Sequence, residues 1–369
     1  MKLETYPDIV KDLEKKERTV HLLMGNGFSI AYDSKIFSYR SLSQHVKESD
    51  NEILKKLFSV VDKSNFEEIM KDLDTFITIS DALDCDDDTK NKLIDARDSL
   101  KAALITSVKE LHPEFVYNIP KEQSMKCANF LYSYIKKGGY LFTTNYDLLM
   151  YWVLMRNKSD EVAIDGFGRD AENTGDEYIP SDEIEWSELR WGKHKESQNT
   201  FYLHGALPLF DTGIDIIKEE YDGLNYLLEN VKKRIDKKEY PIFVTDGSGN
   251  DKLNHIMHNK YLSYCYETLS NIQGSLITYG FNFGEYDEHI IDAINHVAKP
   301  GHKYPDRLLS IYIGFFSEED KKHIESIEHK FKCKVHIFDS KTADIWGKNN
   351  SISFNYFKSG FLILVSYPI

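Results

Sequence analysis

The sequence predicts an α/β protein with a Rossmann-like, doubly wound parallel sheet and a helical insertion after the first strand. Three observations support this prediction. Short apolar runs alternate with helical patterns over the last hundred residues. The first apolar run, residues 19–24, stops at a glycine-rich turn. Between about residues 41 and 137 the apolar residues instead recur at helical spacing.

The remaining elements follow from the same two periodicities. Each expected strand is short, apolar and bounded by polar or turn residues, as in sheets that are covered on both faces. Strands are expected at 19–24, 139–143, 200–203, 242–245, 275–278, 308–313 and 334–338, and helices at 148–154, 261–269, 286–297 and 318–331.

We expect a single domain over residues 1–345, and 346–369 as a C-terminal extension or a final buried strand. The acidic stretch 84–88 within the insertion suits a helix start better than a divalent-ion site, because Asp favours N-caps. The polar, acidic stretch 158–199 is expected to be a long surface excursion. It could be a lid or binding loop, or equally a solvated insertion.

Composition limits the classes of function. The net charge of −14 argues against broad nucleic-acid binding, and the basic run 232–234 is expected on the solvated face of a helix. No apolar run reaches eighteen residues, and the first eighteen lack a signal-peptide core. The cysteines at 85, 127, 265 and 333 form no Cys-x-x-Cys pair, so we expect no zinc site, and reduced thiols in a cytoplasmic protein.

Four polar or glycine-containing motifs each follow an expected strand. They are Gly25-Asn26-Gly27-Phe28-Ser29, Thr143-Thr144-Asn145-Tyr146-Asp147, His204-Gly205 and Tyr279-Gly280-Phe281-Asn282. Ligands of open α/β sheets bind at the carboxyl ends of the strands. The four motifs therefore predict one nucleotide site assembled from several strand ends.

Each motif also has a simpler structural interpretation. The glycines could form an ordinary turn, or let backbone N–H groups approach a pyrophosphate. Asp147 and Asp287 stand near helix starts, where carboxylates are common. Asn145 could orient a ribose hydroxyl, a nicotinamide carboxamide or a water. His204 has the residue type for a general base near neutral pH, although a lone histidine is usually structural.

In order and residue type, the four motifs resemble those of the sirtuin superfamily, and in particular its divergent bacterial branch of NAD-consuming antiphage-defence effectors. Classical sirtuins carry Gly-Ala-Gly-Ile-Ser, Thr-Gln-Asn-Ile-Asp, His-Gly and Gly-Thr-Ser in that order. The resemblance covers roughly residues 19–298.

The resemblance implies a role for each matching residue. Asn145 and His204 would be catalytic, with Asn145 positioning the ribose or the water and His204 acting as the base. Asp147 would support that amide or hold the carboxamide. Residues expected to bind NAD are Gly25, Asn26, Gly27, Phe28, Ser29, Arg40, Asp147, Gly280, Asn282 and Asp287. Arg40 corresponds to an arginine of the family only at a longer spacing.

The chain departs from sirtuin deacylases because it lacks their two Cys-x-x-Cys pairs. The expected activity is therefore that of an NAD glycohydrolase, an abortive-infection effector for which NAD is the substrate and no zinc is needed. The alternatives are a module that senses NAD or an ADP-ribose derivative without cleaving it and, less favoured, a protein deacylase. The resemblance implies a homo-oligomer or a complex with a separately encoded sensor or ATPase. No membrane partner is expected, because no apolar run is long enough to span a bilayer.

Overall fold

The computed structural model describes most of the chain. The described residues are 4–33, 52, 55–56, 66–113, 115–157, 163–173, 179–221, 224, 226–237, 239, 241–244, 249–298 and 307–347.

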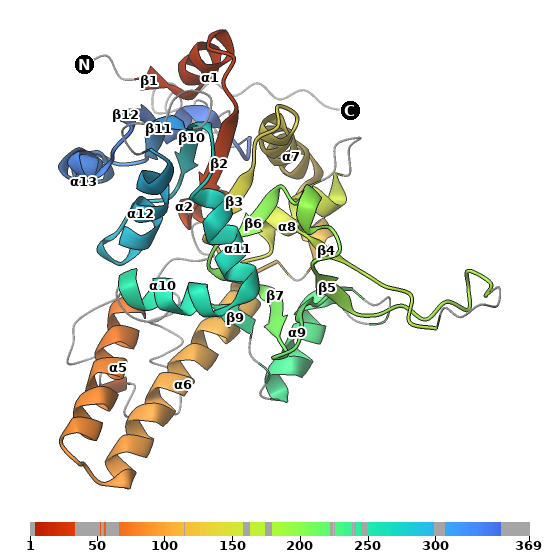
Figure 1. Ribbon diagram of the computed structural model, residues 1–369, viewed down its shortest axis with the longest axis vertical. Coiled ribbons are helices and arrows are strands. Elements are labelled where there is room, and N and C mark those ends of the chain that lie inside the picture. Colours follow the sequence, from red (N-terminus) through yellow and green to blue (C-terminus); the bar gives the residue numbers. More distant parts are fainter. Residues whose placement is uncertain are drawn as a thin grey trace, which may run out of the picture.

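A seven-stranded, all-parallel sheet forms the centre of the molecule (Figure 1). Its order is β1-β12-β11-β10-β2-β3-β6. The strands are β1 Glu4–Thr5, β2 Val20–Met24, β3 Leu141–Thr143, β6 Thr200–Tyr202, β10 Gly274–Tyr279, β11 Leu308–Phe315 and β12 Lys334–Asp339. The predicted fold class is confirmed. The edge strand β1 was not predicted, because two residues are too few to show a periodicity.

The order of the strands matters for the site. Counted along the chain without β1, the strands from β6 to β12 stand in the order 3-2-1-4-5-6, which is the order of dinucleotide-binding folds. The direction of winding reverses between β2 and β10, which pair in parallel with Leu22 opposite Ile277. In such sheets a ligand binds at this reversal, outside the carboxyl ends of the strands.

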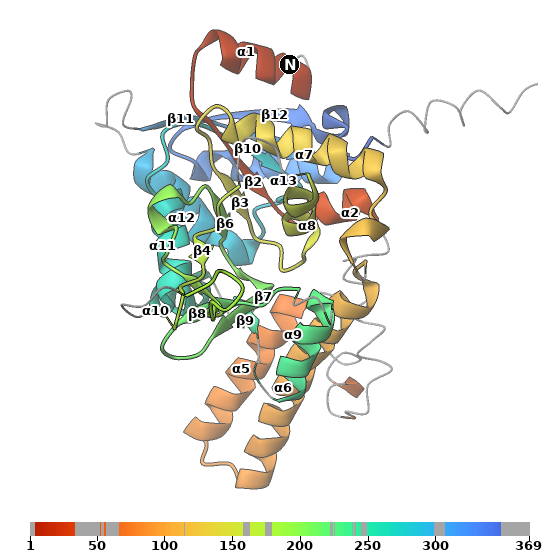
Figure 2. The same ribbon diagram turned by 90° about the vertical axis from the view of Figure 1, so that its right-hand side faces the viewer.

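Helices cover both faces of this sheet, which explains why its strands are continuous apolar runs (Figures 1 and 2). On one side lie α1 Tyr6–Lys15, α7 Lys121–Ile135 and α8 Leu149–Arg156, and on the other α11 Lys260–Leu269, α12 Glu288–Val297 and α13 Glu318–Ile327. Tyr6 of α1 packs on Phe130 of α7 and shares a hydrogen bond with the Tyr134 hydroxyl.

The helical insertion is a long hairpin of α5 Phe66–Ala82 and α6 Asp87–Leu111, which extends away from the parallel sheet (Figure 1). Ion pairs join its arms at Asp74 with Arg97 and at Asp81 with Lys90. Asp86 accepts hydrogen bonds from the backbone and hydroxyl of Thr89, so this aspartate caps α6 as expected. Helix α7 falls within the range expected for the insertion, but it packs on β2 and β3 and belongs to the sheet domain.

A second, antiparallel sheet of order β4-β5-β8-β7-β9 lies beyond the carboxyl edge of the first (Figure 1). Its strands are β4 Phe167–Gly168, β5 Leu189–Trp191, β7 Gly205–Asp211, β8 Ile216–Lys218 and β9 Pro241–Phe243.

Two sequence expectations are corrected by this sheet. The strand expected at 242–245 belongs to it and not to the parallel sheet, and Thr245 lies outside the described residues. The described part of 158–199 is no simple surface excursion, because it contributes β4 and β5. The aromatic rings of Phe167 and Trp191 pack on buried Tyr261, which attaches this stretch to the core.

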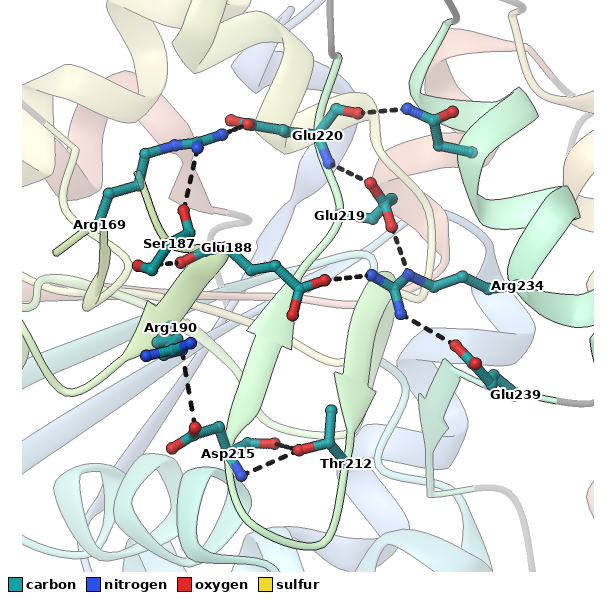
Figure 3. A network of polar contacts seen from close by, with 11 residues as sticks. Arg169, Ser187, Glu188, Arg190, Thr212, Asp215, Glu219, Glu220, Arg234 and Glu239 are labelled. Atoms are coloured by element: carbon teal, nitrogen blue, oxygen red, sulfur yellow. Dashed lines mark hydrogen bonds and ion pairs between the residues drawn. The ribbon is translucent and has the colours of Figure 1, made fainter. Parts of the chain in front are cut away.

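Helix α9, Leu227–Asp236, is tied to the antiparallel sheet by charges (Figure 3). Arg234 donates hydrogen bonds to the carboxylates of Glu188, Glu219 and Glu239. Lys232 and Lys233 are exposed, as expected for the solvated face of a helix, but Arg234 is not on that face.

The end of the described chain returns to its beginning. Two short helices lie here: α2 spans Gly27–Tyr32 and η5 spans Ser340–Ala343. Just beyond η5, the indole of Trp346 lies against Phe28 and Tyr32 of α2. Its N–H donates to the carbonyl of Phe28. Trp346 is thus part of the core, whereas residues 348–369, where a final strand was considered, lie outside the described residues. Within the described residues, no helix is both long and apolar enough to cross a membrane.

Candidate functional site

The four motifs meet at one edge of the parallel sheet, because they follow four adjacent strands, β10, β2, β3 and β6. Backbone hydrogen bonds join the strand ends in sequence: Gly27 N–H to Gly280 C=O at 2.9 Å, Thr144 N–H to Met24 C=O at 3.0 Å and Leu203 N–H to Thr143 C=O at 2.8 Å. The fold therefore brings the four motifs together at one edge of the sheet, as expected from the sequence. The ligand of this edge is a separate matter.

The glycines permit a very close contact between two backbones at the reversal between β2 and β10. A Cβ on Gly27 would lie 2.5 Å from Gly280 Cα, and a Cβ on Gly280 would lie 2.5 Å from Gly27 Cα. Gly280 also has a φ of +64°, a conformation that side chains disfavour. Gly25 is equally confined, since its Cβ would meet Gly280 O at 2.6 Å.

Most backbone donors of the first motif are already used within the protein. Gly25 N–H donates to Tyr279 O, Phe28 N–H to Gly25 O, and Ser29 N–H to Asn26 O. The glycines of this motif thus serve close packing of two loops and a tight turn. The alternative expectation, that these N–H groups approach a pyrophosphate, does not fit their present hydrogen bonds.

A buried chain of hydrogen bonds connects the first two motifs. Asn145 Nδ2 donates to Ser29 Oγ at 3.0 Å, and Ser29 Oγ donates to Asp147 Oδ2 at 2.6 Å. Asp147 Oδ1 accepts from Leu149 N–H at 2.8 Å, at the start of α8. All three polar side chains are at most 9% exposed.

These hydrogen bonds fix the orientation of the Asn145 amide. An ionised Asp147 can only accept hydrogen bonds, so the Ser29 hydroxyl must donate to it and its oxygen is left to accept. Asn145 must then present its NH₂ to Ser29, which turns Oδ1 the other way. Among the described residues, Asn145 Oδ1 has no hydrogen-bond partner. It is therefore an acceptor that a hydroxyl or a water could use.

Burial is the main influence on the acidity of Asp147. Desolvation raises the pKa of its carboxyl above the ordinary value, while hydrogen bonds from Ser29, Leu149 and Asn145 oppose that rise. Asp147 therefore does more than cap a helix, because it also anchors the amide expected to be catalytic.

His204 is almost fully buried, at 3% exposure, and its closest polar neighbour is a second histidine. His204 Nε2 and His289 Nε2 lie 2.8 Å apart and share a hydrogen bond. Asp287 belongs to the same cluster, since one ligand atom from each of these three residues lies within 4.8 Å of the others. Lys252, on α10 Gly249–His258 and fully buried, places its ammonium 3.6 Å from Asp287 Oδ1.

The cluster keeps His204 in its neutral form. Burial, the neighbouring imidazole of His289 and the ammonium of Lys252 together hold the pKa of His204 well below its ordinary value. Burial and Lys252 lower the pKa of His289 to about 3. A neutral imidazole can accept a proton, but the lowered pKa also makes His204 a weaker base than an exposed histidine.

Gly205 explains why the chain can turn sharply directly after His204. Its φ is +80°, and a Cβ would lie 1.9 Å from Ile242 O of β9. The carbonyl of His204 accepts a hydrogen bond from Val244 N–H at 3.0 Å. The sharp turn from β6 into β7 therefore fixes the backbone of His204.

The other predicted residues are less closely engaged. Phe28 is 1% exposed and packs on Trp346, so it is a core residue. Asn26 is half-buried in the first turn, and Asn282 is exposed beside the end of β10. Arg40 lies outside the described residues.

Sequence reasoning missed His289 and Lys252. No motif marks either residue, and in the sequence Lys252 is separated from His204 by β7, β8, α9 and β9. The only signal was that His289 stands two residues after Asp287 at a helix start. The donor set of His204, His289 and Asp287 could also hold a divalent metal ion.

The fold and this edge define a class: an α/β protein with the dinucleotide-binding strand order and a buried Asn–Ser–Asp and His–His cluster at the carboxyl ends of its central strands. Within that class the chain belongs to the family described as "Domain of unknown function (DUF4917)", whose profile matches residues 22–346. The match covers all four motifs, the helical hairpin, the antiparallel sheet, and the parallel sheet except β1 and the start of β2. No curated protein matches the sequence.

Proposed function

We propose that the protein cleaves NAD to nicotinamide and ADP-ribose. The observation that carries the proposal is the arrangement of the site. Asn145 and His204 follow the paired strands β3 and β6, next to the strand reversal where dinucleotides bind in folds of this order. The sirtuin-like order of motifs supports NAD as the nucleotide, and the lack of Cys-x-x-Cys pairs favours cleavage of NAD over deacylation.

The residues suit the chemistry. Nicotinamide is a cationic leaving group, so its departure from the ribose needs little help from an acid. The transition state resembles an oxocarbenium ion, as in glycoside hydrolysis. Asn145 Oδ1, held by Ser29 and Asp147, would accept a hydrogen bond from a ribose hydroxyl or from the attacking water. His204 would remove the proton from that water or hydroxyl.

The resemblance further supports a role as an abortive-infection antiphage effector, which depletes NAD after a trigger. In this proposal the protein acts in the cytoplasm, as a homo-oligomer or with a separate sensor or ATPase subunit. The genes adjacent to the one that encodes this chain would identify such a subunit.

The direct test is to incubate the purified protein with NAD and to measure nicotinamide, ADP-ribose and cyclic ADP-ribose by chromatography. Asn145→Ala and His204→Ala should each lower the rate by about 100-fold or more, the range for loss of a general base. Asn271→Ala and His296→Ala are matched controls, because both side chains bond backbone carbonyls away from the site.

NAD loss that survives in both site variants would contradict the site assignment. Stoichiometric NAD binding in calorimetry, with no product even alongside the natural partner, would instead support a sensing module. Turnover of an acyl-lysine peptide would support deacylation.

A further inference from the structure

Two histidines and an aspartate converge beside the carboxyl edge of the parallel sheet from two distant parts of the chain. His204 follows β6, whereas Asp287 ends the short helix η3, Glu285–Asp287, and His289 lies in the first turn of α12. One nitrogen or oxygen atom from each lies within 4.8 Å of the others. Two imidazoles and one carboxylate suit a divalent transition metal such as Zn²⁺, and this set needs no cysteine.

The two imidazoles face each other through atoms that can bind an ion. His204 Nε2 and His289 Nε2 lie 2.8 Å apart, and the two residues are 3% and 1% exposed. In a tetrahedral zinc site with Zn–N bonds of about 2.0–2.1 Å, two ligating nitrogens stand about 3.3 Å apart. Both rings can therefore ligate one ion after they separate by about 0.5 Å.

The second nitrogen of His289 is a buried polar atom that the fold leaves without a hydrogen-bond partner. This Nδ1 atom has none among the described residues. The carbonyl of Tyr286, three residues earlier, acts on the ring as an acceptor, although the present ring position is outside hydrogen-bond geometry. A ring that ligates through Nε2 carries its proton on Nδ1, and in metal sites this proton is commonly donated to a backbone carbonyl. Tyr286 supplies that carbonyl.

Lys252 limits how tightly an ion can be held. Its ammonium is fully buried and lies 3.6 Å from Asp287 Oδ1. The carboxylate thus already faces one positive charge, and a divalent ion adds two more where water screens poorly. The side chain of Asp287 is 18% exposed, so the ion and a water ligand can reach the cluster from this side. These charges favour a reversible site over a permanent structural one.

We propose that His204, His289 and Asp287 bind one Zn²⁺ ion reversibly, and that the bound ion switches off the cleavage of NAD. The binding follows from the geometry alone, whereas the switch rests on the proposed function. Zn²⁺ takes the Nε2 lone pairs of both rings, and a water completes the coordination. The proton on the line between the rings moves to Nδ1 of the ring that carried it. His204 then has no lone pair left to accept a proton from a water or a ribose hydroxyl.

Calorimetry with Zn²⁺ on protein freed of metal by EDTA and dialysed tests the site without any turnover. The wild type should bind one ion per chain, and Mg²⁺, which prefers oxygen ligands, should not bind. Asp287→Asn and His289→Gln should each weaken Zn²⁺ binding by at least about 100-fold, because the loss of a ligand costs more than the loss of a ligand's partner. His296→Gln, on the same helix as His289, is the matched control. Circular dichroism shows whether each variant is folded.

Lys252→Met gives a prediction of opposite sign. The variant should bind Zn²⁺ about 10-fold more tightly or better, because a repelling charge beside the ion is lost. Damage to the local structure would instead weaken binding. Lys260→Met, at an exposed lysine of the next helix, is the control and should bind as the wild type does. Equal affinity of the wild type and Lys252→Met would overturn the location of the ion.

Inhibition tests the switch separately from the site. Zn²⁺ should stop NAD cleavage over the concentration range in which it binds, and EDTA should restore the rate. Absence of stoichiometric Zn²⁺ binding, or binding that persists in Asp287→Asn and His289→Gln, would overturn the site. Zn²⁺ binding that leaves NAD cleavage unchanged or raises it would overturn the switch. A wild-type protein that binds one Zn²⁺ ion as expected but cleaves no NAD would contradict the proposed function and retain the site.

Discussion

At the scale of single residues, the hydroxyl of Ser29 is the link between the amide and the carboxylate of the second motif. We expect Ser29→Ala to lower NAD cleavage by about 10-fold, because Asn145 loses the acceptor that fixes its orientation. Two buried hydrogen bonds are lost, so the free energy of unfolding should fall by about 1–3 kcal/mol. Kinetics and urea unfolding measure the two effects. Ser263→Ala, at an exposed hydroxyl, is the control, and wild-type activity in Ser29→Ala would contradict this role.

The contact of Gly280 with Gly27 gives a second prediction. Gly280→Ala should destabilise the protein by about 2–4 kcal/mol, because it adds a clash at 2.5 Å to the cost of a positive φ. Gly138→Ala separates the cost of the clash from the cost of the positive φ. Gly138 has a similar φ of +73°, but nothing lies within 4 Å of its Cβ position. Gly138→Ala should therefore lower the free energy of unfolding by only about 1 kcal/mol. Equal losses in the two variants, measured by urea unfolding, would show that the close backbone contact is unimportant.

His112 links the end of α6 to the second motif, and its protonation predicts a pH dependence. Its Nδ1 bonds Pro113 O, and its Nε2 accepts from Leu148 N–H, next to Asp147. Burial lowers the pKa of His112 to about 4, from 6.5. The unfolded chain thus binds more protons between these values, so the contribution of His112 to stability is present above pH 6.5 and lost as the pH falls to 4.

The magnitude can be measured against a variant that does not titrate. Relative to His112→Gln, the wild-type protein should lose about 3 kcal/mol of unfolding free energy between pH 7 and pH 4. His258→Gln, at an exposed histidine, is the control. A difference between wild type and His112→Gln that stays constant with pH would contradict the neutral, buried state of His112.

The residues of the site could be predicted from sequence to the extent that they follow strands. Asn145, Asp147 and His204 stand directly after apolar runs, so their common location follows from the parallel sheet alone. His289 and Lys252 could not be predicted this way, because helices with ordinary sequences bring them in. Ser29 was expected to bind nucleotide, and its contact with Asp147 depends on a tertiary arrangement that no local pattern reveals.

At the scale of elements, the carboxylates around Arg234 attach α9 to the antiparallel sheet (Figure 3). We expect Arg234→Met to lower the unfolding free energy by about 1–3 kcal/mol, because Glu219 would be left without its partner at 16% side-chain exposure. The partial exposure of the group keeps the effect below that of a fully buried pair. Lys233→Met on the same helix is the control, and equal stability of the two variants would show that the network contributes nothing.

The long elements could be predicted from sequence, and the short ones could not. The parallel strands are continuous apolar runs, since helices cover both faces, and such runs are easy to recognise. Strands β4 and β5 have two and three residues and lie in an acidic stretch, so their pattern is that of a loop. What makes them a sheet is the packing of Phe167 and Trp191 on Tyr261.

At the scale of the whole molecule, the helical hairpin and the sheet domain form separate regions (Figures 1 and 2). Asp74 pairs with Arg97 across the hairpin, so residues 75–96 can be replaced by a Gly-Asn-Gly-Ser turn that rejoins the two arms. We expect NAD cleavage to be unchanged and the unfolding free energy to change by less than about 1 kcal/mol, because the tip contacts mainly itself.

The control for this deletion is a hairpin that is shortened less and keeps the same helix register. Replacement of residues 82–89 alone, beyond the Asp81–Lys90 ion pair, removes only the turn and serves as that control. Loss of activity in the longer deletion, with the fold intact by circular dichroism, would assign the hairpin tip a direct part in catalysis.

The contact between Trp346 and Phe28 has a consequence for synthesis of the chain. Gly280, the backbone partner of the first glycine motif, is synthesised roughly 250 residues after that motif. Trp346, whose indole packs on α2, is synthesised later still. At typical rates of synthesis this delay is on the order of ten to fifty seconds. This edge of the sheet is therefore completed only after β10 and Trp346 have been synthesised. A nascent chain that stops before β10 contains both Asn145 and His204 but lacks the Gly280 loop that packs against the first glycine motif.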